Sequence, residues 1–450
     1  MDNSHGKEKK LIKIWRNHIF FVFLPQTKNL NEKKHHDTTI MIKIQKREEC
    51  CGCSACQQIC PQKCISLLPD DEGFLYPQIN LEKCIDCHLC EKACPVINQN
   101  KERTPIEVYA AYNKNEEVRK KSSSGGIFSL IAEEVINKKG VVFGVKFDED
   151  LNVSFDYTES MNGLDQFRGS KYVQATLNNT YKQVLDFLKD ERLVLFTGTP
   201  CQIAGLKSFL KKDYPNLLLV DLICEGVPSP KVWRKYLQEE TEKQLKKNKS
   251  QSPIGETIIP KFTFRDKSKG WKQYGITFQI VDQRSKTSIP VSIYRDSAYL
   301  QALFHYVILR PICYTCPFKK CKSHSDITIA DYWGINILHP EMDDDKGTSM
   351  VFINTEKGKS FFQIDNTVYL KTEYEESFYH NNVITSVKKH SNRDRFYSSI
   401  DNCRSIIKLL SRCTFPLSYK IKELFKRTLS KYVSKKTYHK LEVIWRKAKK

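Results

Sequence analysis

Eight cysteines form two runs of identical spacing, C-x2-C-x2-C-x3-C-P, which suits iron-sulfur chemistry. The first run holds Cys50, Cys53, Cys56 and Cys60, and the second holds Cys84, Cys87, Cys90 and Cys94. Three thiolates on one tight loop can bind three corners of a [4Fe-4S] cluster, and in this spacing the fourth ligates the other cluster. We therefore expect Cys94 to complete the first cluster and Cys60 the second. Zinc knuckles and disulfides are the alternatives, but structural zinc sites use two ligand pairs separated by a longer spacer.

The composition indicates a globular protein from a reducing compartment. The chain has 450 residues, enough for two or three domains, and ten of its 17 cysteines fall between positions 50 and 94. Because thiolate clusters need reducing surroundings, we expect a cytoplasmic location. No run reaches the roughly 20 apolar residues that span a bilayer. The apolar stretch 12–24 contains polar interruptions and lacks a small-residue cleavage site, so it makes a poor signal peptide.

Positive charge is concentrated at the two ends of the chain. The net charge is +21, and residues 404–450 carry fifteen Lys and Arg against two acids. The first 49 residues carry eleven basic and six acidic side chains, so the central body is near neutral. No groove-reading module accompanies the charge, and we expect no nucleic-acid partner. The tail has apolar residues at helical spacing that suit peripheral contact with anionic lipid or an acidic partner, with a helix packed on the body as the alternative. These residues are Ile406, Leu409, Leu410, Leu417 and Ile421.

The chain divides by composition into a small cysteine module and a larger body. Residues 1–40 are polar and lack a core pattern, so we expect a poorly structured N-terminal extension. The cysteine module covers residues 41–100 and is expected to be a domain of the ferredoxin type with two [4Fe-4S] clusters. Between its two cysteine runs, the acidic segment 70–73 turns the chain into the strand-like segment 74–77, which indicates a hairpin. A polar linker follows and ends at Pro105.

Strands and helices alternate after residue 105. Alternation of this kind favours a mainly parallel or mixed sheet with covering helices. Between 261 and 293 the helices are missing, which indicates an antiparallel insertion. The predicted fold class is an α/β domain, α+β in part, with a mixed sheet, preceded by a small α+β two-cluster ferredoxin-like module. The expected strands are 108–112, 141–145, 193–196, 217–222 and 326–333, and the expected helices are 127–135, 201–211 and 230–247.

Four further cysteines lie at positions that this sheet could bring together. Cys201 and Cys224 directly follow predicted strands, and Cys313 forms a C-x2-C pair with Cys316. Strand ends at one edge of a parallel sheet lie close together, and open α/β sheets bind their ligands there. We therefore consider a third [4Fe-4S] cluster on these four thiols, with ordinary buried thiols or a zinc-binding pair as alternatives. Cys321 could replace one of the four. The cysteines expected to bind no metal are Cys51, Cys64, Cys403 and Cys413.

Two loops could bind a phosphate group, although the chain has neither G-x-G-x-x-G nor a P-loop. In the first, hydroxyls and the free amides of a helix N-terminus can form an anion site, with a simple helix cap as the alternative. Its residues are Ser122, Ser123, Ser124, Gly125 and Gly126. The second loop places two cations beside a glycine, with a solvated turn as the alternative. Its residues are Arg168, Gly169, Ser170, Lys171 and Tyr172.

Together these motifs resemble the coenzyme F420 hydrogenase/dehydrogenase beta-subunit family, in the version with an N-terminal two-cluster ferredoxin domain. The resemblance covers residues 42–340. The matching segments are 123–126, 167–174, 198–202, 221–230 and 326–334. It implies FAD in the α/β region, held by the loops at 123–126 and 168–172, and clusters that connect the flavin to a one-electron partner. The implied parts of the body are an N-terminal-type flavin domain at 105–190 and a C-terminal-type α/β domain at 191–345. Beyond the resemblance, we expect the rest of the body at 346–402 and a basic helical tail at 403–450.

The expected function is an iron-sulfur flavoprotein oxidoreductase. Electrons would pass between a ferredoxin-like partner or larger oxidoreductase, the two clusters and FAD, which acts on an unidentified substrate. Tyr172, Trp271 or Trp333 could wall the flavin cavity, and no catalytic acid or base is assigned. The resemblance extends to proteins found among surface-polysaccharide genes, so a sugar pathway is one implied setting. The first alternative is an electron-transfer subunit without its own substrate site, and the second is a membrane-surface protein that acts through its basic tail.

Overall fold

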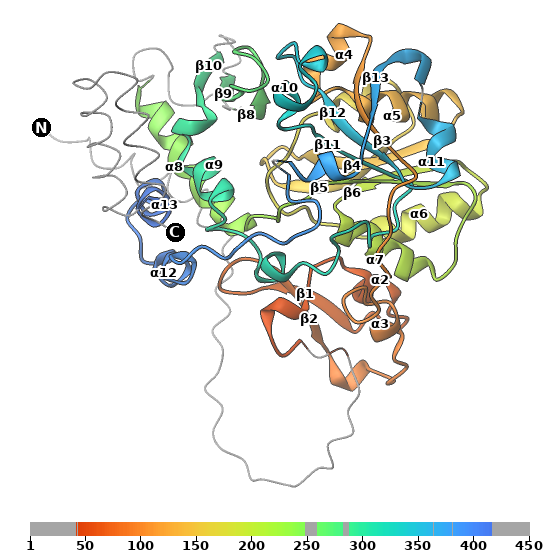
Figure 1. The fold of residues 1–450 in the computed structure, drawn as a ribbon. Coiled ribbons are helices and arrows are strands. Elements are labelled where there is room, and N and C mark those ends of the chain that lie inside the picture. The colour runs from red at the N-terminus through yellow and green to blue at the C-terminus, as the bar shows by residue number, and fades with distance from the viewer. Residues whose placement is uncertain are drawn as a thin grey trace, which may run out of the picture. The chain divides into compact units, whose positions relative to one another are not determined.

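The computed structural model describes residues 42, 44–247, 259–281, 288–362, 364–379 and 381–415 (Figure 1). All of them belong to one compact unit, Met41–Lys450. The expected extension at 1–40 and the tail beyond residue 415 lie outside the described residues.

The cysteine module is a hairpin with two short helices, and its two halves repeat one local geometry. Each helix begins after a residue in the left-handed region, Ser54 with φ 62° and His88 with φ 55°. The hairpin turn closes through a hydrogen bond in which Phe74 N donates to Asp70 Oδ1 at 2.8 Å, at the acidic turn that the sequence predicts. The elements are α2 (Ala55–Ile59), β1 (Ile65–Pro69), β2 (Leu75–Ile79) and α3 (Leu89–Lys92).

The body is built on an eight-stranded mixed sheet with the order β13-β3-β12-β11-β7-β6-β4-β5. The neighbours β11, β7, β6 and β4 are parallel, whereas the pairs towards both edges are antiparallel. This confirms the predicted mixed α/β sheet. Its strands are β3 (Glu107–Asn113), β4 (Val141–Phe147), β5 (Val153–Thr158), β6 (Val194–Gly198), β7 (Leu217–Leu222), β11 (Ile327–Asp331), β12 (Ser349–Ile353) and β13 (Thr367–Thr372).

Both faces of the central strands are buried, because successive apolar side chains enter different core clusters. Val142 and Leu195 pack with α5 on one face, whereas Phe143 and Phe196 pack with α6 and α7 on the other. This arrangement keeps the carboxyl ends of the parallel strands at one edge, clear of the covering helices. The helices are α4 (Glu116–Lys121), α5 (Ile127–Asn137), α6 (Thr180–Lys189), α7 (Pro200–Leu210), α10 (Ile335–Leu338) and α11 (Glu356–Phe361).

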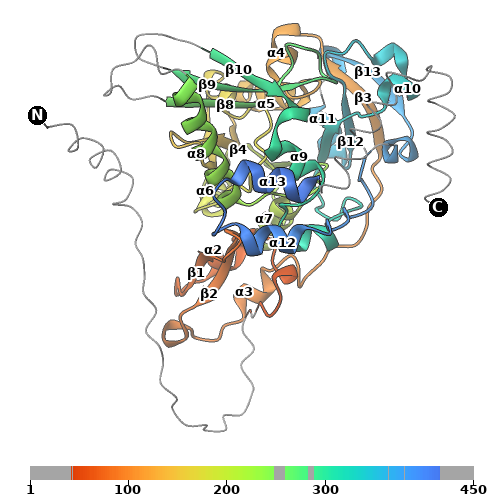
Figure 2. The ribbon, with the colours of Figure 1, turned by 90° about the vertical axis from the view of Figure 1, so that its left-hand side faces the viewer.

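The predicted antiparallel insertion is a three-stranded sheet with the order β10-β9-β8, and helices pack beside it. Trp233 anchors this part, because its ring lies 4.9 Å from Phe262 and 5.3 Å from Tyr299, between centroids. Figure 2 shows α8, α13 and α12 side by side. The elements are α8 (Pro230–Lys247), β8 (Ile259–Asp266), β9 (Gly275–Val281), β10 (Ser288–Ile293), α9 (Ala298–Phe304), α12 (Arg393–Ser399) and α13 (Ile406–Thr414).

Helix α13 lies in the segment that the sequence assigns to the basic tail. Ile406 and Leu410 are buried in the same core cluster as Trp233, and Leu409 packs against it. The apolar side of this helix therefore packs on the body, which was the alternative to lipid contact. The other tail residues of that pattern, Leu417 and Ile421, lie outside the described residues. Within the described ranges, no helix combines the length and the apolar character that a membrane crossing requires.

The cysteine module packs on the body at α7. A Cβ atom on Gly205 of that helix would lie 2.8 Å from the Cys53 Cβ, so the glycine lets the cysteine loop approach. Tyr181 N donates to Gln58 Oε1 at 2.9 Å across the same seam. Short 3-10 helices complete the fold: η1 (Arg47–Glu49), η2 (Leu81–Lys83), η3 (Asn162–Gln166), η4 (Tyr294–Asp296), η5 (Pro311–Thr315), η6 (Pro340–Met342), η7 (Ile364–Asn366) and η8 (Glu375–Phe378).

Candidate functional site

The first cysteine group consists of Cys50, Cys53, Cys56 and Cys94, which lie close enough to influence one another. Burial, and then the thiols of Cys50 and Cys94, raise the pKa of the Cys56 thiol. Burial likewise raises the pKa of Cys94, with Cys50 adding to the effect. Four thiolates in this place would repel one another, so they need a cationic core between them. The structure thus brings together the four residues that the spacing predicts as ligands of the first cluster.

The second cysteine group contains Cys60, Cys84 and Cys90, which pack in the same core cluster as Cys56 and Cys94 of the first group, and Cys87, which is exposed. Cys64, for which the spacing predicts no ligand role, lies with its Sγ 3.4 Å from the Cys60 Sγ. Burial first, and then Cys60 and Cys84, raise the pKa of Cys64 to about 12. The second group therefore contains a fifth sulfur that the repeated motif does not include.

The third cysteine group consists of Cys201, Cys224, Cys313 and Cys316, which surround a small cavity of about 60 Å³. Burial first, and then the other three thiols, raise the pKa of Cys224. Cys201 lies in the first turn of α7, just after β6, and Cys224 follows the end of β7; Cys313 lies in η5 and Cys316 directly follows it. The sheet therefore assembles the four cysteines that the sequence proposed for a third cluster. Cys51 and Cys321 line the same cavity.

A single metal ion has no evident place in the described ranges. No three side chains of His, Cys, Asp or Glu there lie close enough to hold one ion. A [4Fe-4S] cluster binds its four thiolates through four different iron atoms, so its ligands stand further apart than those of a lone zinc. The result therefore concerns single-ion sites and leaves the three cysteine groups as candidates for clusters.

A large cavity of about 1280 Å³ opens at the carboxyl edge of the parallel strands. The residues after β6 and β7 and the last residues of β11 line it, as expected for a ligand site of an open α/β sheet. Both loops that the sequence proposed for phosphate line it as well. From the first loop these are Ser122, Ser123, Ser124 and Gly126, and from the second Arg168, Gly169, Ser170, Lys171 and Tyr172.

The two loops are hydrogen-bonded to each other. Ser170 N donates to Ser123 Oγ at 2.8 Å, and the two serine hydroxyls lie 2.9 Å apart. Gly125 does not line the cavity; a Cβ there would lie 2.5 Å from Ala111 O, so its role is close packing on β3. Gly126 caps α5 with φ 84° and leaves the first amides of that 11-residue helix at the cavity. Amides in this position favour an anion.

The two basic side chains of the second loop are both bound by neighbouring protein groups. The Arg168 guanidinium donates to Ser129 Oγ and Glu133 Oε1, both at 2.9 Å. Lys171 Nζ donates to the backbone oxygens of Gln166 and Arg168 at 2.8 and 2.9 Å. Burial lowers the pKa of Lys171 to about 7. A phosphate in the cavity would therefore meet the serine hydroxyls and helix amides before the Arg168 charge.

Arg265, which no sequence motif pointed to, is a buried cation of the cavity wall. It forms two hydrogen bonds with the Asp331 carboxylate, at 2.8 and 2.9 Å, and donates to Ser123 O at 2.9 Å. Nearby, Lys267 Nζ donates to Ser124 O at 3.1 Å, and burial first, then Arg265, lower the pKa of Lys267 to about 8. Arg265 on β8 and Lys267, which directly follows β8, thus hold the first loop in place.

Two of the three aromatic residues proposed as walls line the cavity. Tyr172 and Trp333 line it, whereas Trp271 stacks on Trp333 at 4.6 Å and donates from Nε1 to Asp331 Oδ1 at 2.9 Å. Trp271 is only 1% exposed and does not line the cavity. Its role is to hold Trp333 and Asp331 in place.

Comparisons with known proteins identify two parts of the chain. Residues 49–98 match the model of a 4Fe-4S dicluster domain, and residues 191–377 match the model for the C terminus of the coenzyme F420 hydrogenase/dehydrogenase beta subunit. No curated protein matches the chain. Among solved structures, a chain of the F420-reducing [NiFe] hydrogenase complex from Methanosarcina barkeri is similar, with 16% identity, a TM-score of 0.39, and coverage of 69% of this chain and 91% of that one.

The matched regions contain the eight cysteines of the module and the third cysteine group. They also contain the residues between 197 and 349 that line the large cavity. They confirm the resemblance drawn from the motifs. The chain thus contains, in this order, a region that matches a 4Fe-4S dicluster domain and a region that matches the C terminus of the coenzyme F420 hydrogenase/dehydrogenase beta subunit.

Proposed function

We propose that the chain is an iron-sulfur flavoprotein oxidoreductase whose dicluster domain exchanges single electrons with a protein partner and whose large cavity binds FAD. The observation that supports this most is a shared wall, because residues 221–227 line both the large cavity and the third cysteine group. Cys51 links the first and third cysteine groups, since its thiol interacts with both Cys53 of the first group and Cys201 of the third. The cysteine groups and the cavity therefore form a continuous series.

The cysteines would hold three clusters in this series. The first and third groups each supply four converging thiols, which is the donor set that a [4Fe-4S] cluster takes. The second group supplies Cys60, Cys84, Cys87 and Cys90, with Cys64 as a neighbouring fifth sulfur. The second and first groups lie in the module and the third at the sheet edge, so the series leads inward to the cavity.

The large cavity has the features that FAD needs. The hydroxyls of Ser123 and Ser170 and the first amides of α5 would hold the phosphates. Trp333 and Tyr172 would border the flavin ring. FAD supplies the two-electron chemistry, because it can exchange a hydride with a substrate and single electrons with a cluster. Arg265, which is paired with Asp331, and Lys267 both donate hydrogen bonds to backbone oxygens of the serine loop and so keep that loop in place.

Metal and flavin content test this function. Anaerobically purified protein is expected to carry about twelve iron atoms, as three [4Fe-4S] clusters require, together with one FAD. Protein with a full complement of iron but no flavin, even after incubation with FAD, would contradict the flavoprotein assignment.

The alternative is an electron-transfer subunit without its own substrate site, and a surface feature favours it. Leu81 and Ile85 are 64% and 60% exposed and flank Cys84, so apolar surface is available for a partner beside the second cysteine group. This alternative expects electron exchange with the partner and no substrate-dependent turnover. The surface-polysaccharide setting and membrane contact by the tail remain predictions from the resemblance and from the charge.

A further inference from the structure

Arg310 is fully buried between the first and third cysteine groups. Its backbone belongs to the third group, since Arg310 O accepts from Cys313 N at 3.0 Å at the start of η5. Its side chain belongs to the first group, since Nε donates to Cys50 O at 2.7 Å. A Cβ atom on Gly52, where φ is +72°, would lie 2.9 Å from the Arg310 Nη1. The guanidinium therefore lies directly against the loop that carries Cys50 and Cys53.

The hydrogen-bond partners of this guanidinium are all neutral. Besides Cys50 O, it donates to Gln174 Oε1 at 3.1 Å and to Leu75 O at 2.9 Å. The Tyr76 ring lies 4.3 Å away, between its centroid and the Arg310 Cζ. In the part of the chain that the structure describes, no Asp or Glu forms an ion pair with Arg310. A buried cation without a counter-charge is costly, so a negative charge must come from another source.

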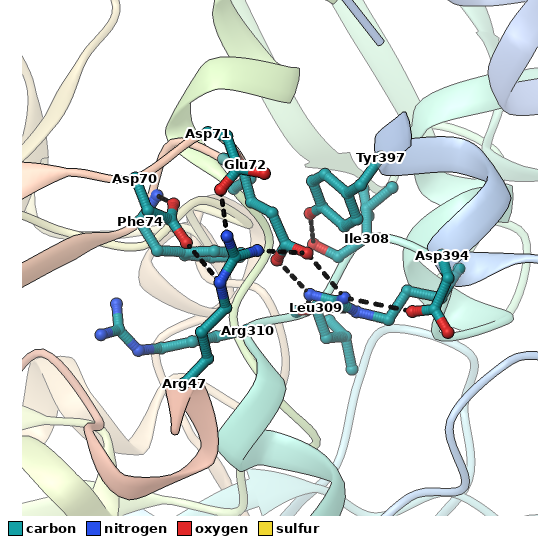
Figure 3. A network of polar contacts seen from close by, with 12 residues as sticks. Arg47, Asp70, Asp71, Glu72, Phe74, Ile308, Leu309, Arg310, Asp394 and Tyr397 are labelled. Atoms are coloured by element: carbon teal, nitrogen blue, oxygen red, sulfur yellow. Dashed lines mark hydrogen bonds and ion pairs between the residues drawn. The ribbon is translucent and has the colours of Figure 1, made fainter. Parts of the chain in front are cut away.

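Arg393, a second buried arginine at the same seam, shows the ordinary arrangement. Its two terminal nitrogens both pair with the buried Glu72 carboxylate, one of them at 2.9 Å. Arg47 pairs with the same carboxylate at 3.0 Å. Figure 3 shows the ion pairs of Arg47 with Asp70 and Glu72, and Arg310 beside this network. The two buried arginines thus differ in their counter-charge and not in their burial.

The groups near Arg310 that can become anionic are mostly cysteine thiols. Cys50 accepts from Arg310 Nε through its backbone oxygen, Cys313 N donates to Arg310 O, and the Tyr76 ring lies beside the guanidinium. The two cysteines, Cys50 and Cys313, belong to the first and third cysteine groups. The negative charge that faces Arg310 is therefore the charge of the sites proposed to hold clusters.

We propose that Arg310 is the shared counter-charge of the clusters at the first and third cysteine groups and raises the reduction potential of both. The proposal rests on the proposed function, because it requires clusters at these cysteines. When a one-electron donor reduces either cluster, the cluster gains one negative charge. No proton moves to or from Arg310, because a guanidinium stays protonated. The fixed cation therefore stabilises the reduced form more than the oxidised form.

The test is an EPR-monitored redox titration with dithionite of the full-length, anaerobically purified protein. Arg310→Gln removes the charge and is expected to shift the potentials of two clusters to lower values, while the second cluster of the module keeps its potential. Arg310→Lys retains the charge and is expected to stay near the wild-type values. Arg393→Gln is the matched control, since Arg393 is also buried but has the Glu72 carboxylate as its own counter-charge. It is expected to lower stability without changing any potential.

Two outcomes would overturn the role of Arg310. One is Arg310→Gln with intact iron and unchanged potentials, and the other is Arg310→Lys with potentials lowered as far as those of Arg310→Gln. If Arg310→Gln loses iron, the Lys variant decides alone, because an iron-replete Lys variant with lowered potentials contradicts the proposal. Wild-type protein that binds no iron would instead overturn the proposed function, so the two failures are distinguishable.

Discussion

The dicluster domain and the third cysteine group hold the same donor atoms by opposite means. In the module, each loop, its left-handed residue and its short helix lie within a few residues of the thiols that they position. In the third group, Cys201, Cys224 and Cys313 come from the start of α7, the loop after β7 and a 3-10 helix, which are far apart in the sequence. The first kind of site forms with its own segment, whereas the second exists only when the sheet is complete. Iron bound at the third group would therefore indicate that the sheet has folded, whereas iron bound in the module would require only the local geometry of its cysteine loops.

Removing one thiol from each site is expected to have the largest effect. Cys316→Ser should lose about four iron atoms, one cluster, and leave the EPR signals of the module in place. Cys94→Ser should lose a similar amount but from the first cluster, although Cys94 is distant in sequence from the other three ligands. Iron analysis and EPR of both variants measure this. Full iron in Cys316→Ser would mean that the third group holds no cluster.

The ion pair between Glu72 and Arg393 tests how strongly the module is tied to the body. Glu72→Gln leaves the buried Arg393 without its carboxylate and should destabilise the protein by about 3–5 kcal/mol. Urea unfolding under anaerobic conditions measures the loss. Asp71→Asn is the control on the same turn, because the Asp71 side chain is 69% exposed and its pair with Arg47 should contribute about 1 kcal/mol or less. Equal effects of the two variants would show that the buried pair does not hold the seam.

Gly205 tests the same seam by packing alone. Gly205→Ala places a Cβ atom 2.8 Å from the Cys53 Cβ and should cost about 1–3 kcal/mol, although alanine is the better helix residue. The accompanying change is a weaker first cluster, measured as iron lost during gel filtration. Ser208→Ala on the same helix is the control for helix propensity. If Gly205→Ala is as stable as the control, the loop of Cys53 does not depend on this close approach.

Lys171 gives the smallest effect and concerns only the body. Burial lowers its pKa to about 7 from the ordinary 10.5, so between these values the unfolded chain binds a proton that the folded protein lacks. Stability should therefore rise with pH from this side chain, by up to about 1.4 kcal/mol per pH unit. Lys171→Met should flatten the slope of thermal stability between pH 7.5 and 9 without changing the iron content. An identical slope in the variant would contradict a lowered pKa of Lys171 in the folded protein.

The module could be predicted from the sequence because its geometry is local, and the spacing of eight cysteines nearly determines which thiols meet. The third group was predicted only from the expectation that parallel strand ends share one edge of the sheet, and β6 and β7 are indeed parallel neighbours. Arg168 was chosen for its charge, yet Glu133 and Ser129 take up that charge, since a motif does not reveal which partners a long side chain finds. Arg265 gave no signal, because its partner Asp331 comes from another sheet.

Helix α13 illustrates a second limit of sequence patterns. An apolar stripe at helical spacing has the same appearance whether it faces lipid or a protein core. The contacts of Ile406 and Leu410 with the core decide this for α13. Arg310 and Gly52 show a third limit, because a buried cation against a cysteine loop depends on a contact between distant segments.

Reduction of the flavin through the clusters tests the central claim most directly. A reduced ferredoxin is too large to enter the cavity, so it should reduce FAD only by way of the cysteine groups. In stopped-flow experiments, wild-type protein should lose its flavin absorbance rapidly after mixing. Cys316→Ser, with the iron of its dicluster domain and its FAD retained, should react no faster than protein stripped of iron. Equally fast flavin reduction in Cys316→Ser and wild type would contradict a path through the third cysteine group.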